Sequence, residues 1–424
     1  MNTRQGLWIA ATALAALGAL ATALIFWLNT RGDAHFAGAA SSVAVTPQWV
    51  ERGAYLALAG NCAGCHTARG GAAFAGGFGI ATPFGTVYSS NLTPDPASGI
   101  GAWSAGDFWR AMHNGRSKDG RLLYPAFPYP NYTQVTREDS DAIHAFLMTQ
   151  PAVAQPNRAH ELRFPYDRQI ALAAWRALFF RPGVFEPQPD RSVEWNRGAY
   201  LVRGLGHCEA CHSTRNALGA TRGGTELGGG LIPLQHWYAP SLASASEAGV
   251  ATWKIEDIVA LLGTGTSSQG STLGPMAQVV YRSTQYLDPG DLQAMAVFLK
   301  ELPQSAAPPP AGPPPEPAVM ARGATLYKDR CAGCHGAEGQ GAARAYRPLA
   351  GNRKVMLSMP TNVVRVIVEG GFPPTTQGNP RPFGMPPFGH SLSNAEIADV
   401  ASYVRNAWGN RAGAVSELEV VRAR

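Results

Sequence analysis

The cysteines of this chain stand in three short clusters of one form. Each cluster reads Cys-x-x-Cys-His, and the six cysteines of the chain all belong to them. In this motif the two thiols add to heme vinyl groups as thioethers, and the following imidazole is the proximal ligand of the iron. The sequence therefore predicts three covalently bound heme c groups. The attachment sites are Cys62, Cys65, Cys208, Cys211, Cys331 and Cys334, and the iron ligands are His66, His212 and His335.

Two other uses of such clusters are less favoured. A structural zinc site needs four ligands, whereas each cluster offers three in one short run. A thioredoxin-like Cys-x-x-Cys would be expected in a βαβ context, which the sequence does not suggest. Heme attachment is the interpretation that uses every cysteine in the same way.

The clusters belong to an internal repeat. An Arg-Gly-Ala triplet precedes each cluster, at residues 52–54, 197–199 and 322–324. An amphipathic pattern closes each repeat and predicts helices over 135–147, 287–299 and 392–404, with Phe146, Phe298 and Tyr403 in register. We therefore expect an all-α fold: three tandem class I cytochrome c-like domains after one N-terminal transmembrane helix.

Methionines supply candidate distal ligands in two repeats. Met276 follows Gly274-Pro275, and Met385 precedes Pro386, at corresponding places after a glycine that ends a helical pattern. A buried methionine is usually a flexible core residue. Its recurrence at one point of the repeat favours iron ligation by Met276 and Met385.

The first repeat departs from this pattern. Phe127 stands where the methionine is expected, and phenylalanine cannot bind iron. Met112 matches apolar core positions of the other repeats, so we expect it to be packing. His113 is the candidate distal ligand. The alternative is that His113 is a solvated helix residue, with an open coordination site or another ligand at the iron. Because Met/His ligation raises the reduction potential, the first heme is expected to have a lower potential than the other two.

The N-terminus carries the signal for a membrane anchor. Residues 7–28 are uncharged, enough for a helix to cross a hydrocarbon core of about 30 Å. Trp8 and Trp27 lie near the two ends, where interfacial aromatics are common. A cleaved signal peptide is the alternative. We expect an uncleaved anchor.

These features give the expected division of the chain. The parts are 1–30 as anchor, 46–150 as the first cytochrome c domain, 151–190 as a connecting segment, 191–302 as the second domain, 303–317 as a Pro-rich linker, 318–410 as the third domain and 411–424 as a tail. The linker is expected to be a semi-rigid spacer. An apolar helical stretch at 170–180 is expected to pack between domains, with a partner or membrane contact as the alternative.

The formal charge of +6 does not indicate a nucleic-acid partner. Heme propionates would offset much of it. With 45% hydrophobic and 15% charged residues, the chain is expected to be globular.

Several strings resemble a known family. They are Ser90–Asp95, Ser117–Gly120, Leu123–Pro125, Gly274–Met276 and Ser283–Tyr286. Together with the three clusters they make the chain similar, over residues 49–408, to the triheme cytochrome c subunit of membrane-bound dehydrogenases of Gram-negative bacteria. That family serves alcohol, gluconate and related dehydrogenases.

The resemblance implies an electron-transfer subunit that does not itself oxidise the substrate. It would take electrons from a catalytic subunit carrying pyrroloquinoline quinone, flavin or molybdopterin, and pass them to ubiquinone or the respiratory chain. The heme domains would lie on the periplasmic side of the inner membrane. Phe127 and the retained anchor depart from the family pattern and suggest a branch that serves an aldehyde or N-heterocycle hydroxylase. The alternatives are a heme enzyme with an open first site and a cytochrome module of a terminal oxidase.

Overall fold

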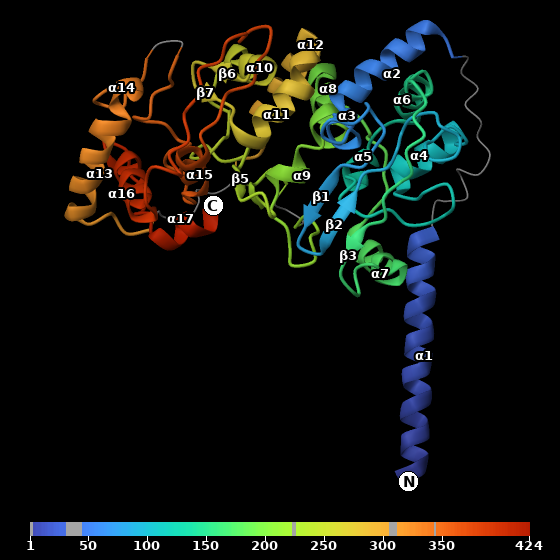
Figure 1. Ribbon diagram of the computed structural model, residues 1–424. Helices are drawn as coiled ribbons and strands as arrows, with labels where there is room; N and C mark the ends of the chain where they lie inside the picture. Colours follow the sequence, from blue (N-terminus) through green and yellow to red (C-terminus); the bar gives the residue numbers. More distant parts are fainter. Residues whose placement is uncertain (1–2, 31–44, 223–225, 305–311, 343–344) are drawn as a thin grey trace. The chain divides into compact units, whose positions relative to one another are not determined.

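The computed structural model describes residues 3–30, 45–222, 226–304, 312–342 and 345–424 (Figure 1). The chain forms two compact units. The first comprises Met1–Leu56 and Cys65–Phe185, and the second comprises Ala57–Gly64 and Glu186–Arg424. Each unit is described separately below.

The first unit begins with α1 (Thr3–Thr30). In the part of the chain that the structure describes, α1 is the one helix long and apolar enough to cross a membrane, with a mean hydropathy of 2.2 over its most apolar window. The rest of the unit, with Ala57–Gly64, contains α2 (Pro47–Ala59), α3 (Cys62–His66), β1 (Gly79–Thr82), β2 (Gly85–Tyr88), α4 (Ala105–Asn114), α5 (Tyr129–Tyr132), α6 (Arg137–Leu147), β3 (Glu161–Leu162) and α7 (Gln169–Phe179).

The second unit contains the second and third repeats. The second has α8 (Val193–Tyr200), the π-helix η2 (Leu201–Leu205), α9 (Glu209–His212), β4 (Gly230–Ile232), β5 (Trp237–Ala239), α10 (Ile255–Thr264), β6 (Thr266–Ser267), β7 (Gly270–Ser271), α11 (Gly274–Arg282), η3 (Thr284–Tyr286) and α12 (Pro289–Lys300). The third has α13 (Pro317–Arg330), α14 (Ala332–His335), α15 (Thr361–Glu369), α16 (Asn394–Asn406) and, at the chain end, α17 (Glu417–Ala423).

The expectation of an all-α fold is wrong, because antiparallel sheets accompany the helices. Strands β1, β2 and β3 form one sheet, β4 pairs with β5, and β6 pairs with β7. Each strand has two to four residues. Such short segments show no period in the sequence. They form where a loop around the expected heme must satisfy its backbone N–H and C=O groups.

The predicted closing helices are confirmed as α6, α12 and α16, and each crosses the first helix of its repeat at a glycine. A Cβ on Gly53 would lie 1.9 Å from the carbonyl oxygen of Ala142, and one on Gly198 would lie 2.0 Å from that of Ala294. In the third repeat, a Cβ on Gly323 would lie 2.4 Å from Asp399 O. The recurrence of the Arg-Gly-Ala triplet therefore reflects a close helix crossing that only glycine permits.

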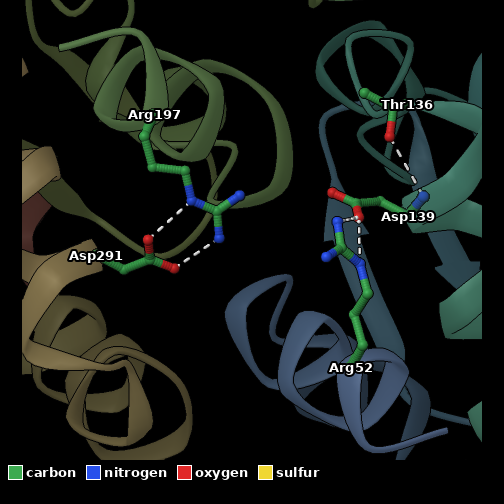
Figure 2. Close-up of polar contacts among 5 residues, drawn as sticks. All are labelled: Arg52, Thr136, Asp139, Arg197 and Asp291. Carbon is green, nitrogen blue, oxygen red and sulfur yellow. Dashed lines mark hydrogen bonds and ion pairs between the residues drawn. The ribbon is translucent and has the colours of Figure 1, made fainter. Parts of the chain in front are cut away.

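The arginine of each triplet forms an ion pair with the closing helix of its repeat. Arg197 Nε and Nη2 donate to the two carboxylate oxygens of Asp291 at 2.8 and 2.7 Å, and Arg52 Nε donates to Asp139 at 3.0 Å (Figure 2). Asp139 N also donates to the Thr136 hydroxyl that caps α6 (Figure 2). Planar pairing of a guanidinium with a carboxylate adds orientation to the helix contact.

The third repeat uses a different helix position for the same pair. Arg322 Nε and Nη2 donate to Asp399 at 2.6 and 3.0 Å. The residue in register with Asp139 and Asp291 is Glu396, which caps α16 through the Ser393 hydroxyl and backbone. The third repeat therefore joins the same two helices through an aspartate that lies three residues later in the closing helix.

The second repeat contains one extra residue between its triplet and its first cysteine. Cys208 comes ten residues after Gly198, whereas Cys62 comes nine after Gly53. The π-helix η2 lies in this interval, with Gly206 N donating to Leu201 O at 2.6 Å. A π-turn inserts a residue without breaking the helix, which accommodates the longer interval of the second repeat.

The third repeat packs directly on the second within their unit. The Asn362 side chain accepts from Tyr238 N at 2.9 Å and donates to Tyr238 O at 2.7 Å. Lys354 Nζ donates to Ser271 O at 2.7 Å, and Thr376 Oγ1 donates to Thr264 O at 3.1 Å. Residues 305–311 of the expected spacer lie outside the described residues. These side-chain bonds, independently of the spacer, hold the third repeat against the second.

Candidate heme-binding sites

Each Cys-x-x-Cys-His cluster forms one short helical turn, in α3, α9 and α14. The three turns share a pattern of exposure at their cysteines. The first cysteine is half-buried and the second is exposed. Two cysteines and a histidine on a single turn are the side chains that heme c attachment requires, so these residues fit the group.

Two of the histidines predicted to be proximal ligands are oriented by a backbone carbonyl. His66 Nδ1 lies 2.7 Å from Ser90 O, and His212 Nδ1 lies 2.7 Å from Pro240 O. The carbonyl can only accept, so Nδ1 carries the proton and Nε2 keeps its lone pair. Burial lowers the pKa of both imidazoles, against the opposing effect of the carbonyl bond. A neutral imidazole with this orientation is the form that binds a metal.

The third histidine lacks this support. His335 Nδ1 is buried and has no hydrogen-bond partner among the residues that the structure describes. Burial lowers the pKa of His335 as well. The backbone bonds around it are kept: His335 O accepts from Gly341 N at 2.8 Å, as His66 O accepts from Gly76 N at 2.8 Å. The third turn therefore keeps the backbone bond to the histidine carbonyl but lacks the bond to the imidazole.

The predicted distal methionines occupy defined backbone positions. Met385 forms a bridge with Gly371, with Met385 N donating to Gly371 O at 2.8 Å and Gly371 N donating to Met385 O at 3.0 Å. Met385 also packs against the core of the third repeat. Met276 lies in the first turn of α11, where a loop was expected. Their role as iron ligands stays a prediction.

The first repeat places aromatic side chains where the methionine was expected. The Phe127 ring lies 5.4 Å from that of Tyr132 and 6.5 Å from that of Tyr129. Met112 is 5% exposed in α4, in keeping with core packing.

His113 is held inside the first repeat. It is 5% exposed, its ring stacks on Trp109 at 4.6 Å, and its Nδ1 lies 2.8 Å from Thr133 O. Burial lowers its pKa. The Nδ1-to-carbonyl bond repeats the arrangement of His66 and His212, and it also ties α4 to the segment after Phe127. His113 as the distal ligand stays a prediction.

Sequence reasoning did not identify the groups that orient these residues. The carbonyls of Ser90 and Pro240 were not found because a backbone acceptor has no residue-type signal. Asp139 and Asp291 had a usable signal, since both lie at the same place in the first turn of a closing helix.

Comparison with known proteins defines the class first. Residues 50–151 and 320–408 match the model of the family described as cytochrome c. These ranges contain the first and third Cys-x-x-Cys-His turns. The chain is thus a c-type cytochrome, and this domain implies covalently bound heme c.

Similar proteins then define the family. The chain is 40% identical over 411 residues to the cytochrome c subunit of alcohol dehydrogenase (quinone) of Gluconacetobacter polyoxogenes, covering 91% of this chain and 87% of the relative. It is 37% identical to the gluconate 2-dehydrogenase cytochrome c subunit of Pantoea cypripedii, over 86% and 87% of the two chains. It is also 40% identical to a nicotinate dehydrogenase subunit of Pseudomonas putida, covering 96% of this chain but 34% of that protein. The chain belongs to the family of dehydrogenase cytochrome c subunits.

Proposed function

We propose that the chain binds three covalent heme c groups and is the electron-transfer subunit of a membrane-bound dehydrogenase. When bound, each heme iron supplies a one-electron step between its ferric and ferrous states. The chain's own residues attach the groups, orient the proximal imidazoles and fix the repeats. The observation that carries the proposal is the threefold recurrence of the Cys-x-x-Cys-His turn, each following a glycine helix crossing.

The catalytic partner is proposed to be a separate dehydrogenase subunit. The relatives are named as cytochrome c subunits of alcohol, gluconate and fructose dehydrogenases, which points to a division of labour between chains. The partner would carry pyrroloquinoline quinone, flavin or molybdopterin. The electrons would pass to ubiquinone or to another acceptor of the respiratory chain.

The proposed location is the inner membrane, with the heme-binding repeats on the periplasmic side. Helix α1 supports this, because its apolar side chains are exposed along its length; Leu7, Leu14 and Leu20 are examples. A 28-residue helix is about 42 Å long at 1.5 Å per residue, which exceeds a hydrocarbon core of about 30 Å.

Anaerobic reduction tests the proposed function. The full chain, purified with its hemes, is mixed with the copurifying dehydrogenase and the substrate of that enzyme, and the heme absorbance is followed. We expect full reduction with all three components and none when the dehydrogenase is omitted. Substrate oxidation by the cytochrome chain alone would contradict the proposal, as would copurification with a heme–copper oxidase instead of a dehydrogenase.

Phe127 supports a second candidate, a heme enzyme with an open first site. Two measurements on the isolated chain separate these functions: carbon monoxide binding to the three reduced hemes, and catalytic turnover. Binding at one heme, together with turnover by the isolated chain, would favour the enzyme. Absence of turnover supports the electron-transfer role, whatever the ligation of the first iron.

A further inference from the structure

Helix α7 has an unusual distribution of charge for a helix at the protein surface. Its sequence, Gln169–Phe179, contains one charged residue, Arg176, and that side chain is buried at 4% exposure. Ile170 and Leu178 are instead 66% and 64% exposed. Ala174 lies four residues from each, so the three share one face of the helix. Surface helices normally turn charges to water and apolar residues inward. α7 buries apolar residues such as Leu172 as expected, but it also buries its one charge and leaves Ile170 and Leu178 exposed.

The apolar surface extends beyond the helix and has basic residues around it. Phe164 is 77% exposed and Phe179 is 36% exposed. Arg168 and Arg181 are exposed directly before and shortly after α7, and Arg163 is exposed beside Phe164. Arg168 also pairs with Asp167 at 3.3 Å, so the border is basic but includes one carboxylate. An apolar face flanked by arginines matches the layered chemistry of a bilayer surface, where acyl chains lie beneath anionic phosphates.

The contact between α7 and α1 locates this surface relative to the membrane. Asn29, at the end of α1, donates from Nδ2 to Ala173 O at 2.9 Å and accepts from Arg176 Nε at 3.0 Å. Arg116 Nη2 donates to Asn29 O at 2.8 Å. The end of α1 is thus bonded to the inner side of α7, and both lie in the first unit.

The depth of α7 follows from the length of α1. Because the helix is longer than the hydrocarbon core, its last turn lies at the headgroup level, where the 58%-exposed Trp27 belongs. Asn29 is in that turn, and α7 is bonded to Asn29. The exposed face of α7 therefore lies at the height of the lipid interface.

We propose that α7 and Phe164 form a second membrane-contact surface, which lies in the bilayer interface beside the anchor. Its occupant is the phospholipid surface. The inference rests on the proposed role of α1 as an anchor. Two attachments, α1 and α7, would hold the first repeat in one orientation at the membrane, whereas a single helix would leave it free to rotate.

Site-specific photocrosslinking in native membranes tests this surface. The photoreactive residue p-benzoylphenylalanine replaces Ile170, Leu178 or Phe164 in the full heme-loaded chain. Phe164 provides the replacement nearest in shape, so one position remains informative if the helix variants fail to fold. The matched control is the exposed Glu51 in α2, which Figure 1 draws at the far end of the first unit from α1.

The proposal predicts a mass shift of one phospholipid at Ile170, Leu178 and Phe164, and none at Glu51. Adducts with another protein at these three positions would overturn the proposal. So would a lipid-adduct yield at these positions that is no higher than the yield at Glu51. An alkaline carbonate wash of the same membranes reports on the anchor separately. Release of the chain would refute the anchor itself, whereas retention without lipid adducts would refute only the role of α7.

Discussion

At the scale of single residues, His66 and His212 are oriented alike, each by a bond from Nδ1 to a backbone carbonyl. Met276 and Met385 are the predicted distal ligands of the second and third repeats, and Phe127 stands at the corresponding place in the first repeat. The identity of the axial ligand tunes the reduction potential of a heme, and a phenylalanine cannot supply the thioether of a methionine. The first heme should therefore differ most from the others.

The substitution Phe127→Met tests this difference. We expect it to raise the lowest of three reduction potentials toward the other two, because a thioether would then be available to the first iron. Spectroelectrochemical titration measures the potentials. Phe127→Leu is the control and should leave the lowest potential nearly unchanged. Three indistinguishable potentials in the unaltered protein would refute the premise, and an equal shift in both variants would refute the ligand explanation.

At the scale of elements, the first and last helices of each repeat are joined by a glycine crossing and an Arg–Asp pair. The sequence predicted the closing helices because amphipathic periodicity extends over more than two turns in each. It did not predict the sheets, since strands such as Thr266–Ser267 are too short to show a period. It also missed the partners of Arg52 and Arg197, because a repeated arginine does not reveal which carboxylate it contacts.

The substitution Gly198→Ala should destabilise the second repeat. Its Cβ would meet Ala294 O at 2.0 Å, and overpacking of this kind costs about 1–3 kcal/mol or more. Gly290→Ala in α12, the partner helix, is the matched control because a Cβ there meets nothing within 4 Å. Urea unfolding followed by circular dichroism compares the two. Equal free energies of unfolding would show that the crossing is not as close as described.

At the scale of the whole molecule, the second and third repeats are joined by side chains that bond to backbone carbonyls. Asn362 with Tyr238 and Lys354 with Ser271 are examples. Such contacts could not be predicted from the sequence, because their acceptors carry no residue-type signature. The sequence instead predicted a semi-rigid Pro-rich spacer between the two repeats.

Lys354 makes this junction sensitive to pH. Burial, with the nearby Arg353, lowers the pKa of Lys354 to about 8. The unfolded chain keeps the ordinary pKa of 10.5 and so holds more protons between these values. The contribution of Lys354 deprotonation to the free energy of unfolding is therefore absent below about pH 8 and rises toward pH 10.5. Chemical denaturation across this range should show a steeper rise for the unaltered protein than for Lys354→Met. Parallel curves would contradict the assignment.

The number of hemes on each polypeptide tests the central claim most directly. The mature chain, produced with its cytochrome c maturation machinery, is measured by intact mass under denaturing conditions, which keep thioether-bound heme and release other heme. The account predicts three hemes on the unaltered chain. It predicts two after Cys208→Ala with Cys211→Ala, in the repeat outside the matched cytochrome c ranges. Fewer than three hemes on the unaltered chain, or an unchanged number in the variant, would contradict it.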